Sequence, residues 1–198
     1  MTASGGKPLV VLIGPMGAGK TTIARVVAER LGVPAGDSDA DVEAVAGKPV
    51  SEIFIDDGEP VFRELERAAV ARALAEHDGV LALGGGAVLD PLTERDLAAG
   101  GHLVVFLDVS IGDAARRIGL NRDRPLLLGN PRAQWISIME RRRPVYERVA
   151  SAVVSTDGRA PQAIADDVVA LVTAHEAAGE AAGKSAGEAA GEAAGERT

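Results

Sequence analysis

Short runs of apolar residues alternate along the chain with longer stretches in which apolar residues recur at helical spacing. Runs that are apolar throughout are typical of strands buried on both faces, as in a parallel sheet covered by helices. The pattern predicts strands at 9–13, 80–83, 103–107 and 152–154, and helices at 20–31, 61–76, 111–118, 132–149 and 160–174. This alternation predicts a doubly wound α/β sheet with right-handed crossovers. A further strand is expected before Asp37 from the spacing alone, because Pro34-Ala35-Gly36 is a poor strand sequence.

The C-terminal segment has a different pattern, a four-residue repeat of the form AAGE over residues 177–196. Glycine at every fourth position costs about 1 kcal/mol each relative to alanine, and the repeat has no large side chain that could dock on a core. We therefore expect a single domain over residues 1–175 and a disordered low-complexity tail over 176–198, with a weak transient helix as the alternative.

Composition narrows the class of protein. The chain has 198 residues, a net charge of −8 and no cysteine. The length suits one domain, and the absence of cysteine excludes disulfides and cysteine-based metal sites. The acidic balance argues against a nucleic-acid partner, and no segment has the roughly 20 apolar residues of a membrane-spanning helix.

Positive charge is concentrated in one region. Residues 116–148 hold nine arginines against three acidic residues, a local charge of about +6. Some of these arginines are expected to be solvated helix residues. An acidic protein with one arginine-rich segment is nevertheless expected to bind a small anion there.

The sharpest motif is GPMGAGKT at residues 14–21, which fits GxxxxGK[ST] between a predicted strand and a predicted helix. In such a loop, backbone N–H groups and the helix N-terminus surround a phosphate. Lys20 would reach the β- and γ-phosphates, and the Thr21 hydroxyl would face Mg²⁺. A glycine-rich turn without a ligand is the less favoured interpretation. The short chain and the absence of an N-K-x-D motif favour a small kinase over a motor or a guanine-nucleotide switch.

Two further motifs follow predicted strands, where ligands of parallel sheets gather. In Asp37-Ser38-Asp39, one carboxylate could hold Mg²⁺ through water and the other could accept a proton from a hydroxyl nucleophile; a capping or turn role for Asp39 is the alternative. Gly84-Gly85-Gly86 allows close approach of a ligand to the backbone, or is simply a flexible turn.

Arg63 and Glu66 are three residues apart on a predicted helix and therefore share one face. Such an arginine could hold a substrate carboxylate through two parallel hydrogen bonds, although a solvated ion pair explains the spacing equally well. The turn-rich stretch 116–124 could close over phosphates, exclude water and stabilise a group that is being transferred.

Taken in order, these motifs resemble those of the shikimate kinase family of the bacterial cytoplasmic type, from about residue 9 to residue 171. The discriminating ones are D-S-D, D-G-E-x-x-F-R-x-x-E at 57–66, L-G-G-G-A-V at 83–88, R-P-L-L at 124–127 and R-x-P-x-Y at 142–146. The resemblance implies transfer of a phosphoryl group from ATP to the 3-hydroxyl of shikimate. It also implies a monomer with a P-loop kinase fold, a five-stranded parallel sheet in the order 2-3-1-4-5 and a mobile lid at about 116–130.

The resemblance also assigns roles to individual residues. Asp39 would bind shikimate and act as the base, with Lys20 and Arg124 as the other catalytic groups. The remaining shikimate-binding residues would be Arg63, Glu66, Gly84, Gly85, Gly86 and Arg142. ATP would be bound by Gly17, Ala18, Gly19, Lys20, Thr21, Thr22, Arg117, Arg124, Arg159 and Pro161. Mg²⁺ would be held by Thr21 directly and by Asp37 through water.

Some alternatives stay open on the sequence alone. Arg141, Arg142 and Arg143 are consecutive, and the spacing to Pro144 and Tyr146 favours Arg142 as the carboxylate ligand. Another small-metabolite kinase, such as a gluconate kinase, shares the P-loop and the lid architecture. A nucleotide-dependent binding switch without an acceptor is a hypothesis from a different class.

Overall fold

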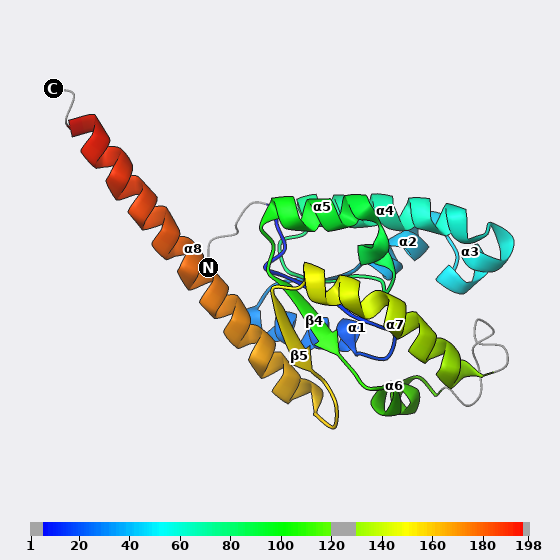
Figure 1. Ribbon diagram of the computed structural model, residues 1–198. Helices are drawn as coiled ribbons and strands as arrows, with labels where there is room; N and C mark the ends of the chain where they lie inside the picture. The colour runs from blue at the N-terminus through cyan, green and yellow to red at the C-terminus, as the bar shows by residue number, and fades with distance from the viewer. Residues whose placement is uncertain (1–5, 120–129, 196–198) are drawn as a thin grey trace.

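The computed structural model describes residues 6–119 and 130–195, and its centre is a sheet of five parallel strands (Figure 1). The predicted strand order is confirmed: β2-β3-β1-β4-β5. In the central strand, Val11 pairs with Leu81 on one side and with Val104 on the other. The strands are β1 (Val10–Ile13), β2 (Ala35–Asp37), β3 (Val80–Ala82), β4 (Val104–Asp108) and β5 (Ala152–Ser155).

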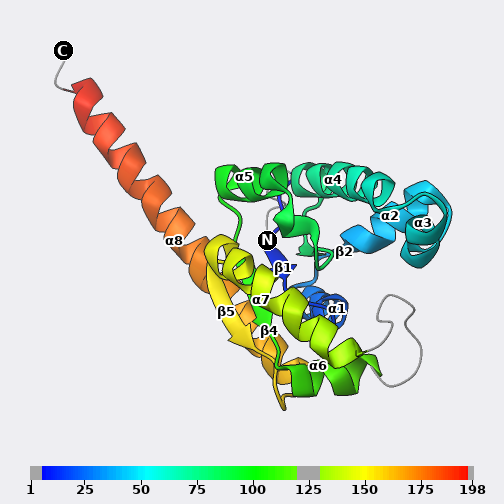
Figure 2. The same cartoon turned by 45° about the vertical axis from the view of Figure 1, so that its right-hand side comes forward.

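Helices cover both faces of this sheet. α1 (Lys20–Leu31) and α8 (Pro161–Gly195) pack against each other on one face, and α4 (Glu59–Glu76), α5 (Pro91–Gly100) and α7 (Pro131–Val149) lie on the other (Figures 1 and 2). The residues of β1 are fully buried between these layers, which explains why its sequence is apolar at every position. The remaining helices are α2 (Ser38–Ala46), α3 (Val50–Asp56), α6 (Ile111–Ile118) and the short 3₁₀ helix η1 (Ala87–Leu89).

β2 forms although its sequence favours no strand. Ala35, Gly36 and Asp37 pair in register with Val80, Leu81 and Ala82 of β3. The strand therefore depends on pairing with a buried neighbour rather than on its own residues.

α2, α3 and the first half of α4 form a small layer with its own apolar cluster of Val42, Ile53, Phe62 and Ala69. The sequence pattern predicted neither α2 nor α3, and it also missed α5. The D-S-D motif in fact begins α2: the Asp37 side chain accepts a hydrogen bond from the Asp39 N–H over 3.0 Å. Asp37, rather than Asp39, is thus the capping residue.

In the C-terminal segment, for which the sequence predicts a disordered tail or a weak transient helix, α8 continues as one helix to Gly195 and points away from the body of the molecule (Figures 1 and 2). The first part of α8 is fixed by Ile164, Val168 and Val172, which belong to the main core. A helix that is already nucleated extends through alanine-rich sequence without a new nucleation cost, and this offsets the penalty of the repeated glycines.

Two structural points bear on the other expectations. Most of the expected lid, with Arg124, falls in residues 120–129, which lie outside the described part of the chain. Among the residues described, no helix has both the length and the apolar character needed to cross a bilayer.

Candidate active site

The glycine-rich loop joins β1 to α1, as its sequence predicts. Gly14 and Gly17 have φ angles of 142° and 89°, and a Cβ on Gly14 would lie 2.6 Å from the Leu107 carbonyl oxygen. A residue other than glycine would therefore be strained and would clash at that position. The loop curls around the Lys20 side chain, whose Nζ donates to the carbonyl oxygens of Gly14 at 2.9 Å and Pro15 at 3.2 Å. Burial lowers the pKa of Lys20, while the carboxylates of Asp39 and Asp37 oppose this shift.

Thr21 and Asp37 meet at the end of this loop. The Thr21 hydroxyl donates to Asp37 Oδ2 over 2.6 Å. A hydroxyl backed by a carboxylate suits Mg²⁺, which binds oxygen ligands and keeps several waters and phosphate oxygens in its shell. No cluster of three or more histidine or acidic side chains that could hold a metal ion occurs in the described residues.

Asp39 lies at the middle of the site, on the first turn of α2. Burial raises its pKa to about 6; the nearby Asp37 adds to this rise and the Lys20 ammonium opposes it. Gly84 lies directly against the carboxylate, because a Cβ there would be 2.3 Å from Asp39 Oδ1. The Gly84 N–H donates to the buried Ser38 hydroxyl over 2.8 Å. The D-S-D motif and the triglycine are thus packed against each other, at the carboxyl ends of β2 and β3.

Arg63 and Glu66 form an ion pair inside the cavity. Arg63 Nη1 is 2.6 Å from Glu66 Oε2, and Glu66 is only 4% exposed. Burial raises the pKa of Glu66, and its hydrogen bond from Arg63 counters that rise. Arg63 also pairs with Glu59 at 3.0 Å. Gly86 allows this arrangement, since a Cβ there would lie 2.5 Å from Arg63 Nη1.

The three consecutive arginines of α7 point to different partners. Arg142 lines the cavity and donates through Nη1 to the Gly85 carbonyl oxygen at 3.0 Å. Arg143 pairs with Asp108 at 2.5 Å, and Arg141 donates to the Ser137 carbonyl oxygen of its own helix. Of the three, Arg142 is the one placed beside the triglycine.

Most of the expected site residues border one cavity of about 910 Å³. The P-loop lies along this cavity. One part of the cavity is lined by Asp39, Arg63, Glu66 and Arg142, and another part is lined by Arg117, Arg159 and Pro161. Of the expected site residues, the following line the cavity: Gly17, Ala18, Gly19, Lys20, Thr21, Thr22, Asp39, Arg63, Glu66, Gly85, Gly86, Arg117, Arg142, Arg159 and Pro161. Gly84 and Asp37 support it from behind through the contacts given above, and Arg124 is outside the described residues.

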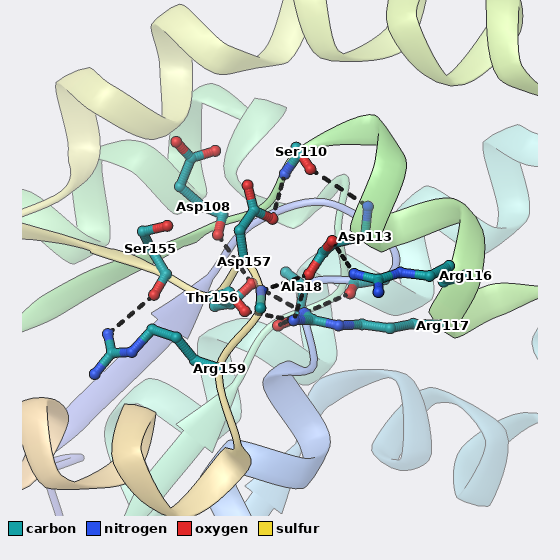
Figure 3. Close-up of polar contacts among 12 residues, drawn as sticks. Ala18, Asp108, Ser110, Asp113, Arg116, Arg117, Ser155, Thr156, Asp157 and Arg159 are labelled. Carbon is teal, nitrogen blue, oxygen red and sulfur yellow. Dashed lines mark hydrogen bonds and ion pairs between the residues drawn. The ribbon is translucent and has the colours of Figure 1, made fainter.

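Hydrogen bonds hold Arg117 between the P-loop and the turn that follows β5 (Figure 3). Its Nη1 donates to the Gly17 carbonyl oxygen at 3.2 Å and to the Thr156 hydroxyl at 2.9 Å. Arg159, in the turn between β5 and α8, donates to the Ser155 carbonyl oxygen and pairs with Asp167 at 2.7 Å. The two arginines therefore come from different elements, α6 and the β5–α8 turn, yet border the same space.

Sequence reasoning missed the apolar lining of the cavity. Val50, Phe54 and Phe62 line the cavity, and the ring centres of Phe54 and Phe62 lie 4.5 Å apart. Trp135 is buried, lines the cavity and donates to the Met16 carbonyl oxygen at 3.2 Å. The four-residue spacing of Val50 and Phe54 was the available signal, and it has meaning only once α3 is known to be a helix.

A P-loop at the head of a five-stranded parallel sheet, with a cavity that continues to a carboxylate and two arginines, defines a kinase that phosphorylates a small molecule. The family model for shikimate kinase matches residues 16–173. The shikimate kinase of Streptomyces avermitilis is 54% identical over 170 residues, which are 86% of this chain and 98% of that protein. The chain belongs to the shikimate kinase family and is an ATP-dependent kinase.

Solved structures agree with this assignment. The structure of the shikimate kinase from Acinetobacter baumannii in complex with shikimate has a TM-score of 0.79 at 31% identity. The match covers 87% of this chain and 95% of that chain. A gluconokinase from Sinorhizobium meliloti 1021 has a TM-score of 0.56 at 20% identity, over 87% of this chain and 94% of that chain. At that identity the likeness shows the fold alone, so the gluconate kinase alternative is not favoured.

Proposed function

We propose that the cavity transfers the γ-phosphoryl group of ATP to the 3-hydroxyl of shikimate, with the residue roles given below. The observation that carries these roles is the position of Asp39. Its carboxylate is buried in the same cavity as the Lys20 ammonium and the Arg63–Glu66 pair. A proton acceptor therefore shares the cavity with a phosphate-binding loop and with arginines, Arg63 and Arg142, that suit an anionic acceptor.

On the donor side, the loop amides and Lys20 bind the β- and γ-phosphates of ATP. Lys20 now donates to two carbonyl oxygens of its own loop, and bound phosphate would replace these partners with charged oxygens. When Mg²⁺ is bound with ATP, it would supply positive charge that neutralises the phosphates. Thr21 would be its ligand, and Asp37 would orient the Thr21 hydroxyl and a coordinated water.

On the acceptor side, Arg63 and Arg142 hold the shikimate carboxylate. Both line the cavity, and both are oriented by fixed acceptors, Glu66 and the Gly85 carbonyl oxygen. A guanidinium that is held in this way loses little freedom when a carboxylate binds. The acceptor hydroxyl would then face Asp39, which takes its proton as the oxygen attacks phosphorus.

We further propose that a single chain is the functional unit. The groups assigned to ATP, to Mg²⁺ and to the acceptor within the described residues all come from one copy of the chain. Size-exclusion chromatography with light scattering at assay concentrations should give the mass of one chain, and activity that rises more than linearly with enzyme concentration would contradict the proposal.

The test of the proposed reaction is identification of its product. The protein is incubated with Mg-ATP and shikimate, and the product is examined by phosphorus–proton correlation NMR. A single monophosphate ester coupled to the ring proton at position 3 supports the proposal. An ester at another hydroxyl, or release of inorganic phosphate without an ester, would overturn it.

A further inference from the structure

Tyr146, the last residue of the R-x-P-x-Y motif, has no role in the reaction described above, yet it contacts the site. Its side chain is completely buried, and its hydroxyl donates to the Gly85 carbonyl oxygen over 2.5 Å. Arg142 Nη1 donates to the same oxygen over 3.0 Å. A tyrosine and a cavity arginine thus share one backbone acceptor, and both lone pairs of that oxygen are used.

The tyrosine ring is held independently of this bond. Tyr146 and Arg142 are four residues apart on α7 and so lie on one face of that helix. The ring stacks on Phe106 of the central sheet, with ring centres 5.1 Å apart and an angle of 27°. The hydroxyl therefore reaches Gly85 from a ring that is fixed to the core. The hydrogen bond from this hydroxyl can hold the triglycine loop in place.

Gly85 lies between the phosphate-binding loop and Arg142. A Cβ on Gly85 would lie 3.5 Å from the Gly14 carbonyl oxygen, and 3.7 Å from both Arg142 Nη1 and the Met16 nitrogen. A rotation of the Gly85 peptide would therefore move the acceptor of Arg142 relative to the phosphate-binding loop. The hydroxyl is available as a donor, because burial raises the pKa of Tyr146, an effect that the charge of Arg142 opposes.

We propose that Tyr146 is a positioning residue for the acceptor substrate: it fixes the Gly85 carbonyl oxygen, and through that oxygen it sets the direction in which Arg142 presents its free N–H groups. This rests on the proposed function, in which Arg142 binds the acceptor carboxylate. When the hydroxyl is absent, the Gly85 peptide is held by Arg142 alone, and the arginine is less well aligned for an incoming carboxylate.

The first test is Tyr146→Phe, which keeps the stacked ring and removes one hydrogen bond. We expect the KM for shikimate to rise about fivefold, the effect of one ordinary hydrogen bond, while the KM for ATP stays within about twofold. The matched control is Thr93→Val, since Thr93 is also a buried hydroxyl, lies on α5 away from the cavity, and has no hydrogen-bond partner for its Oγ1 among the described residues. That variant should leave both KM values unchanged.

A double-mutant cycle separates positioning from general packing. In an Arg142→Lys background, Tyr146→Phe should add less than twofold to the KM for shikimate, because the group that the tyrosine aligns is already gone. Full additivity of the two changes, equal losses for both substrates, or a wild-type KM for shikimate in Tyr146→Phe would overturn the inference. If instead the wild-type protein does not phosphorylate shikimate at all, the proposed function itself fails.

Discussion

Arg63 and Glu66, one turn apart on α4, form an ion pair of 2.6 Å in which the carboxylate is buried and the guanidinium reaches the cavity. A surface ion pair at this spacing contributes little. Here, the second carboxylate Glu59 holds the other side of the guanidinium at 3.0 Å, so that the planar group has a fixed orientation. The pair therefore serves to present Arg63 rather than to stabilise the helix.

Replacing Arg63 by lysine keeps the charge and removes this planar geometry. An ammonium cannot make two parallel hydrogen bonds to a carboxylate, so we expect the KM for shikimate to rise roughly ten- to hundredfold, corresponding to about 1.5–3 kcal/mol. The KM for ATP should change little. Steady-state kinetics with each substrate varied in turn provide the measurement, and an unchanged KM for shikimate would argue against Arg63 as a carboxylate ligand.

Asp39→Asn should separate binding from turnover. Asparagine has nearly the same shape but is not a base, so turnover should fall at least a hundredfold, whereas ATP affinity measured by calorimetry should stay within about threefold. Parallel losses of ATP affinity and turnover would remove Asp39 from the acceptor part of the site.

The pKa of Asp39, raised to about 6, predicts the pH dependence of the wild-type enzyme. The carboxylate form is the active base, so kcat/KM for shikimate should fall as the pH decreases through about 6. A profile that stays flat from pH 5 to pH 8 would contradict this role.

The same pKa makes a prediction about stability. Because the folded state raises this pKa from 3.8, the ionised carboxylate lowers stability above about pH 6, and the effect disappears as the pH falls toward 4. Asp39→Asn should therefore have a higher Tm than the wild type at pH 8, and the difference should shrink at pH 4.5. A difference that does not depend on pH would indicate that the variant acts through packing instead.

The triglycine offers a comparison of neighbouring positions. Gly86→Ala should displace the Arg63 guanidinium, because the new Cβ would lie 2.5 Å from Nη1, and the KM for shikimate should rise. At Gly85, the nearest atom is 3.5 Å from the new Cβ, an ordinary contact, so Gly85→Ala is the matched control and should have the smaller effect. The reverse order would contradict the view that Gly86 is needed to leave space for Arg63.

Local sequence patterns predict much of the fold and of the site. The P-loop and its role follow from the glycine spacing between a buried strand and a helix, and Asp39, Arg63 and Arg142 are found in one cavity. What local patterns could not predict is what depends on contacts distant in sequence. β2 forms because β3 pairs with it, and Phe54 reaches the cavity because α3 packs against α4. The helical continuation beyond residue 175 likewise depends on the docking of Ile164 and Val168 on the core.

That continuation lies outside the region that the family model matches, which ends at residue 173. We predict that a chain ending at His175 keeps its turnover, since none of the described residues that line the cavity comes after Ile164. The measurement is kcat of the shortened and full-length chains, each checked for folding by circular dichroism. Loss of turnover in a folded shortened chain would give the segment a role in catalysis.

The most direct test of the account is ADP release from Mg-ATP in the presence of shikimate, of gluconate and of no acceptor. The P-loop, Asp39 and the two arginines predict that shikimate alone accelerates ADP release above the acceptor-free rate. Equal rates with and without shikimate, or faster release with gluconate, would contradict it.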